Sequence, residues 1–355
     1  MSQPPPLDLT LNETLDSGEP LSAPFARLAA ALEARAAVPL HMFVFGSCDA
    51  HAATLSAMKN ALGEINWPVT WSEGGGCFGR PLAGVQCQAL ANAAGVRRVT
   101  LGNRVVASVF EDADARHCLL GGLGPEDTGL TPAEQTTETF AALDAALGAA
   151  GLAFADIART WFYNRDILAW YDDFNAVRTG FYGRQKFTSG SLPASTAVSG
   201  NNPRGAALTL AAWAVRPLTP AAVVAELPSP LQCPAPAYGS SFSRAMEITS
   251  GGRLRVTVSG TASIEPGGKT ARVGDVPGQI ALTMDVIAAI LATRGLTFAD
   301  VTRASAYCKA PSTAAVFEEW KALNKLPRFP SVPIHCDICR DDLLFELELG
   351  AARTL

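Results

Sequence analysis

The sequence predicts an α+β fold in which mixed sheets are each covered by helices on one face. The strongest observation is an internal repeat, because GLAFADIARTWFY at 151–163 matches GLTFADVTRASAY at 295–307, an offset of 295 − 151 = 144 residues. The same offset carries Gln135 onto Gln279, Thr139 onto Thr283 and Leu147 onto Leu291. A second observation is that strands and helices interleave in each copy, with hairpins as well as crossovers. We therefore expect two copies of one unit, packed as pseudo-equivalent neighbours.

Each copy is predicted to contain paired strands, a long helix, a short G-L-x-F-x-D turn and another strand. The first copy has these elements in RVVASVFE and HCLLGGLG, then at 131–150 and 157–163. The second has them in RLRVTVSGTASI, then at 276–294 and 301–307, with a final strand at 343–349. Between the copies, Trp170, Phe174, Val177 and Phe181 recur at helical spacing, which favours a core role for these aromatic and aliphatic side chains.

The remaining residues complete the predicted domain organisation. Prolines and acids dominate residues 1–22, which predicts a disordered lead-in, and helix and strand patterns then alternate from Pro24 to Trp71. We expect an N-terminal module over 23–190, a proline-rich connector over 191–236 and a C-terminal module over 237–355. The glycine-rich stretch 73–84 is predicted to be a loop, because it lacks the G-K-[ST] ending and the strand–helix context of a phosphate-binding loop.

Composition excludes several classes of function. Charged residues make up only 17% of the 355 residues and the net charge is −5, so no basic field for nucleic acid is present. No stretch is long and apolar enough for a membrane span. The first residues lack the positive end and apolar run of a signal peptide, which predicts a cytoplasmic protein.

The eight cysteines are scattered, and in a cytosolic chain this favours reduced thiols. Cys336 and Cys339 spell C-x-x-C, but a zinc site needs a second pair or histidines at ligand spacing, which the four histidines do not supply. We therefore expect no metal, and no nucleotide or flavin cofactor.

The closing strand places two acids beside apolar residues. With period-two alternation, Phe345 and Leu347 face one side, whereas Glu346 and Glu348 face the other. A partly desolvated glutamate is a candidate general acid, because burial raises a carboxyl pKa toward neutral pH. The alternative is that this face is solvated, as one face of an alternating strand usually is.

The repeat unit resembles the Rid (reactive intermediate deaminase, YjgF-like, endoribonuclease L-PSP) superfamily, whose chorismate-mutase-like modules carry active sites in the clefts between them. Within it, the chain is similar to the two-module chorismatases over residues 115–350. The resemblance is carried by ARTWFY (158–163), Phe174 to Arg178, PASTAVSG (193–200), YGSSFSRA (238–245), SGTASI (259–264), GDVPGQ (274–279) and DICRDDLLFELE (337–348). Two departures are Trp161-Phe162-Tyr163, where chorismatases tend to have tryptophan–asparagine–tyrosine, and the Asn201–Arg204 insertion.

The resemblance implies cleavage of the enolpyruvyl ether of chorismate to pyruvate and a hydroxybenzoate or dihydroxycyclohexadiene carboxylate. Glu346 is then the general acid, and Glu348 tunes it or is solvated. Arg244, Arg178 and Arg159 are candidates for binding the substrate carboxylates, since a guanidinium holds a carboxylate bidentately. Tyr163 and Tyr238 are candidate hydrogen-bond donors. Cys339 and Ala245 occupy positions that divide the branches of the family, and Cys339 resembles the hydroxybenzoate-forming branch.

Each candidate has an ordinary structural reading as well. Arg244 would then be a loop arginine, Arg178 a paired helix residue, and Arg159, which recurs as Arg303, a structural residue. Two other functions remain open, namely Rid-type hydrolysis of enamines and imines, and ligand binding without catalysis. The Rid resemblance implies that deaminases bind the substrate carboxylate with an arginine on the strand before the closing one. The segment at that place here, FPSVPIHCDI, contains no arginine, which disfavours deaminase activity. The expected partner is a small carboxylate substrate, and a homo-oligomer, trimer or dimer, is expected because Rid modules commonly associate in threes.

Overall fold

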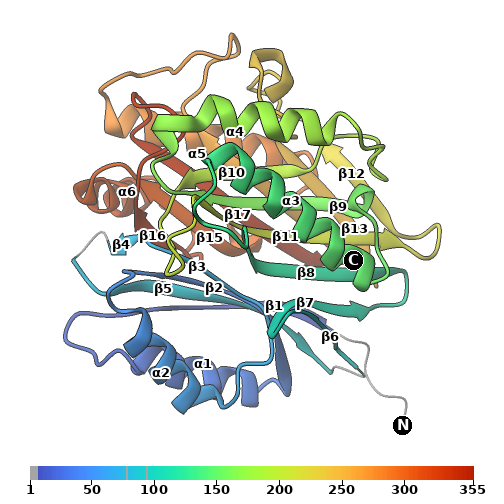
Figure 1. The fold of residues 1–355 in the computed structure, drawn as a ribbon. Coiled ribbons are helices and arrows are strands. Elements are labelled where there is room, and N and C mark those ends of the chain that lie inside the picture. The colour runs from blue at the N-terminus through green and yellow to red at the C-terminus, as the bar shows by residue number, and fades with distance from the viewer. Residues whose placement is uncertain (1–6, 77–78, 93–94) are drawn as a thin grey trace.

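The computed structural model describes residues 7–76, 79–92 and 95–355. Within these residues the strands form three sheets, each with helices on its outer face, and the inner faces meet in the middle of the molecule (Figure 1). We name the three parts the N-terminal unit (7–91), the middle module (97–217) and the C-terminal module (223–354). The predicted α+β class, with mixed sheets covered on one face, is confirmed.

The N-terminal unit has a four-stranded sheet in the order β1-β5-β2-β3. Helices α1 and α2 cover it, at the bottom of Figure 1, and enclose a core that includes Phe25, Leu28 and Met58. Its elements are β1 (Leu7–Thr14), α1 (Ala23–Glu33), β2 (Ala37–Gly46), α2 (His51–Leu62), β3 (Val69–Ser72), β4 (Gly75–Gly76) and β5 (Leu82–Ala91). The short β4 pairs with the sheet of the C-terminal module instead of its own.

The middle module has a six-stranded sheet in the order β10-β9-β11-β8-β7-β6. Its long helix begins at a capping box, in which the side chains of Thr131 and Glu134 satisfy each other's backbone N–H groups. The elements are β6 (Arg97–Leu101), β7 (Arg104–Glu111), β8 (Ala115–Leu123), α3 (Pro132–Ala149), a 3-10 turn (Phe154–Asp156), β9 (Ile157–Asn164), α4 (Ile167–Tyr182), β10 (Ala194–Ser199) and β11 (Leu208–Pro217). Trp170 and Phe174 are buried in its core, and Val177 and Phe181 pack against that core.

The C-terminal module has a seven-stranded sheet in the order β12-β13-β14-β17-β15-β16-β4. Its elements are β12 (Val223–Leu227), a 3-10 turn (Ala235–Tyr238), β13 (Ala245–Ser250), β14 (Arg253–Ala262), α5 (Val276–Ala292), a 3-10 turn (Phe298–Asp300), β15 (Val301–Cys308), α6 (Pro311–Leu323), β16 (Val332–His335) and β17 (Phe345–Thr354). The sequence repeat therefore corresponds to a structural repeat, because α3 and β9 match α5 and β15.

All three parts share one topology. A strand leads through a helix to a parallel neighbour, as β2–α2–β3, β9–α4–β10 and β15–α6–β16. A last strand then returns and lies antiparallel against the first, as β5, β11 and β17. The N-terminal unit is a shorter version of the same design, with one strand in place of the hairpin before its first helix. The sequence repeat did not identify this third copy.

The expected lead-in and connector are corrected. Residues 1–6 lie outside the described residues, but residues 7–14 form β1, which pairs along its whole length with β5. The expected connector 191–236 contains β10 and β11, which belong to the middle sheet, so only 218–222 separates the last two sheets. The expected N-terminal module 23–190 accordingly combines most of one unit with most of the next.

A prediction tests the correction at β1. Leu11 is buried in the core of the N-terminal unit, whereas Leu7 on the same strand is 42% exposed. We expect Leu11→Ala to lower the free energy of unfolding by about 2–5 kcal/mol, because it leaves a cavity, and Leu7→Ala to change it by under about 0.5 kcal/mol. Urea denaturation of both variants measures this. Equal effects would show that β1 is not packed as described.

Candidate active site

A pocket lies where the C-terminal module meets the middle module. The bulge in β14 at Ser259–Gly260 brings that strand against β10, where Ser259 Oγ accepts from Ser195 N at 2.9 Å and Thr196 Oγ1 accepts from Gly260 N at 2.9 Å. Helix α4 and the loops before β13 and β17 complete the walls. The lining residues are Tyr171, Arg178, Ser195, Thr196, Ala197, Tyr238, Ser240, Phe242, Arg244, Gly260, Ala262, Ile264, Cys339, Arg340, Leu343 and Glu346.

Glu346 is the acid of this pocket. It stands on β17 between Ala262 of β14 and Tyr307 of β15, and the residue is only 4% exposed. Within the described part of the chain its carboxyl group has no hydrogen-bond partner. Burial raises its pKa to about 8, and the negative charge of Glu348 adds to the rise. Glu346 therefore carries a proton at neutral pH, as a general acid must.

Glycine at position 260 makes room for this carboxyl group. A Cβ atom on Gly260 would overlap Glu346 Oε1 and crowd the Thr196 side chain. A larger residue at this position of the SGTASI motif would therefore displace the Glu346 carboxyl group, whereas the backbone φ of Gly260 is negative and open to any residue.

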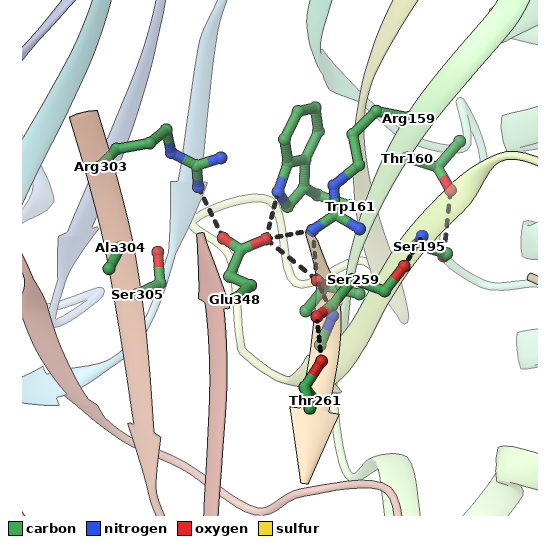
Figure 2. Close-up of polar contacts among 12 residues, drawn as sticks. Arg159, Thr160, Trp161, Ser195, Ser259, Thr261, Arg303, Ala304, Ser305 and Glu348 are labelled. Atoms are coloured by element: carbon green, nitrogen blue, oxygen red, sulfur yellow. Dashed lines mark hydrogen bonds and ion pairs between the residues drawn. The ribbon is translucent and has the colours of Figure 1, made fainter. Parts of the chain in front are cut away.

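Glu348 lies two residues further along the same strand and is in the opposite charge state. Its Oε2 accepts from Arg159 Nη2, from Trp161 Nε1 at 2.5 Å and from Thr196 Oγ1 at 2.9 Å. Its Oε1 accepts from Arg303 Nη2 at 2.6 Å, so that the carboxylate lies between arginines of β9 and β15 (Figure 2). Burial alone would raise the pKa of Glu348, but the two guanidinium groups lower it below its ordinary value.

Three guanidinium groups line the pocket. Arg178 Nη2 donates to Asn175 Oδ1 at 2.5 Å, Arg244 Nε donates to the carbonyl of Cys233 at 3.1 Å, and Arg340 Nη1 donates to the carbonyl of Gly268 at 2.9 Å. Among the described residues none of the three forms an ion pair with a carboxylate. Their positive charge is therefore not neutralised by the protein.

Aromatic rings hold these guanidinium groups in place. The Cζ atom of Arg244 lies 5.3 Å from the ring centre of Tyr238 and 5.5 Å from that of Phe242. Arg178 Cζ lies 5.9 Å from the ring centre of Phe242, and Arg340 Cζ lies 5.3 Å from that of Tyr238. Such stacking fixes the orientation of a guanidinium while its N–H groups stay available to a ligand.

The structure brings together five of the residues proposed from sequence, namely Glu346, Arg244, Arg178, Tyr238 and Cys339. The four other candidates named from the sequence do not line this pocket. Arg159 and Glu348 bind each other in the interior, with Glu348 fully buried and not solvated. Tyr163 is buried beside Phe43 and Phe45, and Ala245 packs in the core of the C-terminal module.

Sequence reasoning missed Arg340 and Tyr171. Arg340 belongs to the recognised motif DICRDDLLFELE. The sequence did not reveal that Arg340 lies against the ring of Tyr238 in the pocket. Tyr171 lies near the start of α4, directly after Trp170. The helix is kinked at Trp170, whose φ of −147° and ψ of 22° are not helical. The helical spacing that marked its neighbours as core gave no signal for a ring that reaches the pocket.

The two other clefts of the molecule differ from this pocket. Glu346 on β17 lies opposite Tyr307 on β15. The equivalent pairs are Thr209 opposite Tyr163 in the middle module and Gly84 opposite Phe45 in the N-terminal unit. A Cβ at Gly84 would come within 2.8 Å of the Glu13 carbonyl and 3.1 Å of Val332. Of the three equivalent positions, only the one on β17 carries an acid.

Other features concern metals, thiols and membranes. The described residues contain no group of three His, Cys, Asp or Glu side chains that is arranged to hold a metal ion. Cys336 and Cys339 form no disulfide. No helix in the described residues has the length and apolar character needed to cross a membrane.

Comparison with solved structures identifies the fold. A chorismatase crystal structure aligns with 99% of this chain and 100% of its own, with a TM-score of 0.65 and 19% identity. This chain has the chorismatase fold. Two shorter structures, yeast Mmf1 and the YjgF gene product of E. coli, each align with 36% of this chain and 98% of their own. Both are 18% identical to it, and their TM-scores are 0.32 and 0.29. No family model matches the sequence, and no curated protein matches it.

The resemblance stated from sequence is thus confirmed for the chorismatase fold. In this fold the pocket lies between two modules, because β14 and the closing strand β17 of the C-terminal module lie against β10 of the middle module. It leaves the reaction to be argued from the side chains of the pocket.

One prediction concerns Gly260. We expect Gly260→Ala to displace the Glu346 carboxyl group and to lower activity in the assay described below by at least about tenfold, because small displacements at a reacting group are costly. Gly148→Ala is the matched control, since a Cβ there meets nothing within 4 Å in α3. Unchanged turnover in Gly260→Ala would show that the carboxyl group is not held against Gly260.

A second prediction tests the proton on Glu346 without any substrate. A pKa of about 8 in the folded state, against 4.5 ordinarily, means that folding takes up a proton between these values. Native stability should therefore fall as pH rises from about 5 to 8, by up to about 1.4 kcal/mol per pH unit from this group. Glu346→Gln should lack this component, whereas Glu319→Gln, an exposed control on α6, should retain it. Denaturation curves at several pH values measure the difference, and parallel pH profiles for all three proteins would refute the assignment.

Proposed function

We propose that this protein cleaves the enolpyruvyl ether of chorismate to pyruvate and a ring product. The observation that carries the proposal is a buried acid, Glu346, whose raised pKa favours the protonated form and which faces a pocket lined by three guanidinium groups without carboxylate partners. The whole-chain likeness to a chorismatase supports it at the level of the scaffold.

The charge of the pocket suits a dianion. Chorismate carries two carboxylates, and each guanidinium offers a planar pair of donors to one of them. Arg244 and Arg178 both lie against Phe242, which places two such groups around one ring. We assign the two substrate carboxylates to Arg178, Arg244 and Arg340, with Tyr171 and Tyr238 as neutral donors, because burial raises the pKa of both phenols.

The proton of Glu346 goes to the methylene carbon of the enolpyruvyl group. This turns the methylene into a methyl group and leaves an oxocarbenium-like carbon, which the new Glu346 carboxylate stabilises. Water, or the neighbouring ring hydroxyl, then adds to that carbon and loses a proton back to Glu346. When water adds, the adduct loses its hydroxyl proton as Glu346 returns one to the ether oxygen, and breaking the bond between that oxygen and the former enol carbon releases pyruvate and a ring diol. When the ring hydroxyl adds, the cyclic ketal breaks the former enol carbon's bond to the ether oxygen and the ring carbon's bond to the former hydroxyl oxygen. That hydroxyl oxygen leaves as the keto oxygen of pyruvate, while a ring C–H proton is lost and the retained ether oxygen gains a proton, which gives a hydroxybenzoate.

Cys339 takes part as a neutral side chain. Burial, with Glu346 adding to it, raises the pKa of its thiol to about 12, so it is not a nucleophile at neutral pH. Its small volume next to Glu346 leaves room for the substrate ring, and the ring product distinguishes attack by water from attack by the ring hydroxyl.

The test is incubation of the protein with chorismate, with pyruvate followed by coupled reduction and the ring product by chromatography. We expect Glu346→Gln to lower kcat by at least about 100-fold, which is the usual contribution of a general acid. Arg244→Gln should chiefly raise KM, and Glu319→Gln should behave as the native protein. The native rate should fall as pH rises through about 8, where Glu346 loses its proton.

Two results would contradict the proposal. One is pyruvate formation no faster than the spontaneous reaction, and the other is a native rate that survives in Glu346→Gln. In either case the same protein is assayed with imines of amino acids for ketoacid and ammonia, which is the activity that the Rid resemblance offers as the alternative.

A further inference from the structure

A second cavity lies where all three parts of the chain meet. Its walls come from β1 and β5 of the N-terminal unit, from β8 and β11 of the middle module, and from β14, β15 and β17 of the C-terminal module. It shares no lining residue with the pocket of Glu346.

Three arginines and one aspartate line this cavity, and two of the arginines already have carboxylate partners. Arg255 grips Asp8 through two hydrogen bonds, of 2.9 Å from Nε and 2.6 Å from Nη2, and also lies 3.9 Å from Asp112. Arg303 is paired with Glu348 at 2.6 Å. The third, Arg253, forms neither an ion pair nor a side-chain hydrogen bond within the described part of the chain, and its Nε is buried without a partner.

Arg253 is partly exposed as a residue, but its Nε–H group is buried without an acceptor, which an anion would supply. Desolvation lowers the pKa of Arg253, the charge of Asp8 acts in the opposite direction, and the charge of Arg255 lowers it further. A buried donor without an acceptor is unfavourable, because it has lost its hydrogen bonds to water and gained none in the protein. A ligand carboxylate would supply the missing acceptor.

The rest of the wall is apolar and aromatic. Leu40, Phe110 and Leu119 form one buried cluster, and Trp213 packs against it. The indole Nε1 of Trp213 is also buried without a partner among the described residues. The cavity therefore combines one free cation and one spare neutral donor with a surface suited to a flat ring.

We propose that this cavity is a second binding site, for a cyclic monocarboxylate whose carboxylate pairs with Arg253 and whose ring packs on Trp213 and Phe110. A dicarboxylate fits it less well, because only one of its guanidinium groups lacks a carboxylate partner. The site of Glu346 has three such groups, so the two cavities select for different ligand charge. This inference does not depend on the proposed reaction.

The test uses benzoate as the monocarboxylate probe and isophthalate as the dicarboxylate. Calorimetric titrations are carried out on the native protein, on Arg244→Gln to weaken the Glu346 pocket, and on Arg253→Gln. Arg353→Gln is the matched control. It also removes one arginine, from the neighbouring strand β17, but Arg353 forms an ion pair with Asp300 and does not line the cavity. Thermal melting of each variant establishes that it is folded.

We expect benzoate to bind Arg244→Gln and Arg353→Gln, and to bind the double variant Arg244→Gln/Arg253→Gln at least about tenfold more weakly, since a charge-assisted hydrogen bond is lost. Isophthalate should bind Arg244→Gln more weakly than benzoate does. The indole N–H signal of Trp213, assigned with Trp213→Phe, should shift on addition of benzoate to Arg244→Gln.

Three results would overturn the inference. They are loss of all benzoate binding in Arg244→Gln, unchanged binding when Arg253→Gln is added to that variant, and an unmoved Trp213 signal while benzoate binds. Failure of the chorismate assay leaves these titrations unaffected, so the two proposals are tested separately.

Discussion

The ion pairs of Glu348 with Arg159 and Arg303 hold the centre of this molecule together. They join β17 and β15 of one module to β9 of another, and a buried carboxylate of this kind is tolerable only because its oxygens accept from several donors at once. Thr196 extends the same network to Gly260 and therefore to the edge of the pocket. The place where the two modules meet, and with it the shape of the candidate active site, depends on this one carboxylate.

Two carboxyl groups on one strand face the same side and are driven to opposite charge states. Glu348 stays ionised because two guanidinium groups bind it directly, whereas Glu346 has no such partner and keeps its proton. The charge of the first also disfavours ionisation of the second. Divergence of neighbouring carboxyl pKa values is a recurring way of assigning acid and spectator roles within one site.

The repeat, the elements that both of its copies share and the acid on the closing strand were predictable, because they follow from spacing along the chain. The strand at 7–14 was not. Alternation in FELE correctly put Glu346 and Glu348 on one face, but it did not reveal which strand lies across from them, so Arg159 was assigned to the substrate instead of to Glu348. The third copy was not found because His41-Met-Phe-Val-Phe45 shares only a general pattern with Arg159-Thr-Trp-Phe-Tyr163. Both segments begin with a basic residue type and have aromatic rings at their third and fifth positions. Arg340 and Arg253 each line a cavity whose other walls come from distant parts of the sequence. Spacing along the chain does not encode such contacts.

Three related parts on one polypeptide also break a constraint that identical subunits would obey. In a ring of identical chains, replacing a glycine by a glutamate at the acid position would alter all three clefts together. Here Gly84, Thr209 and Glu346 occupy that position independently, so the backbone packs tightly at Gly84 whereas Glu346 places a carboxyl group in a pocket. Covalent linkage thus lets the residues of one interface diverge while those of the others keep a packing role, and the cavity where the three parts meet has walls of three different compositions.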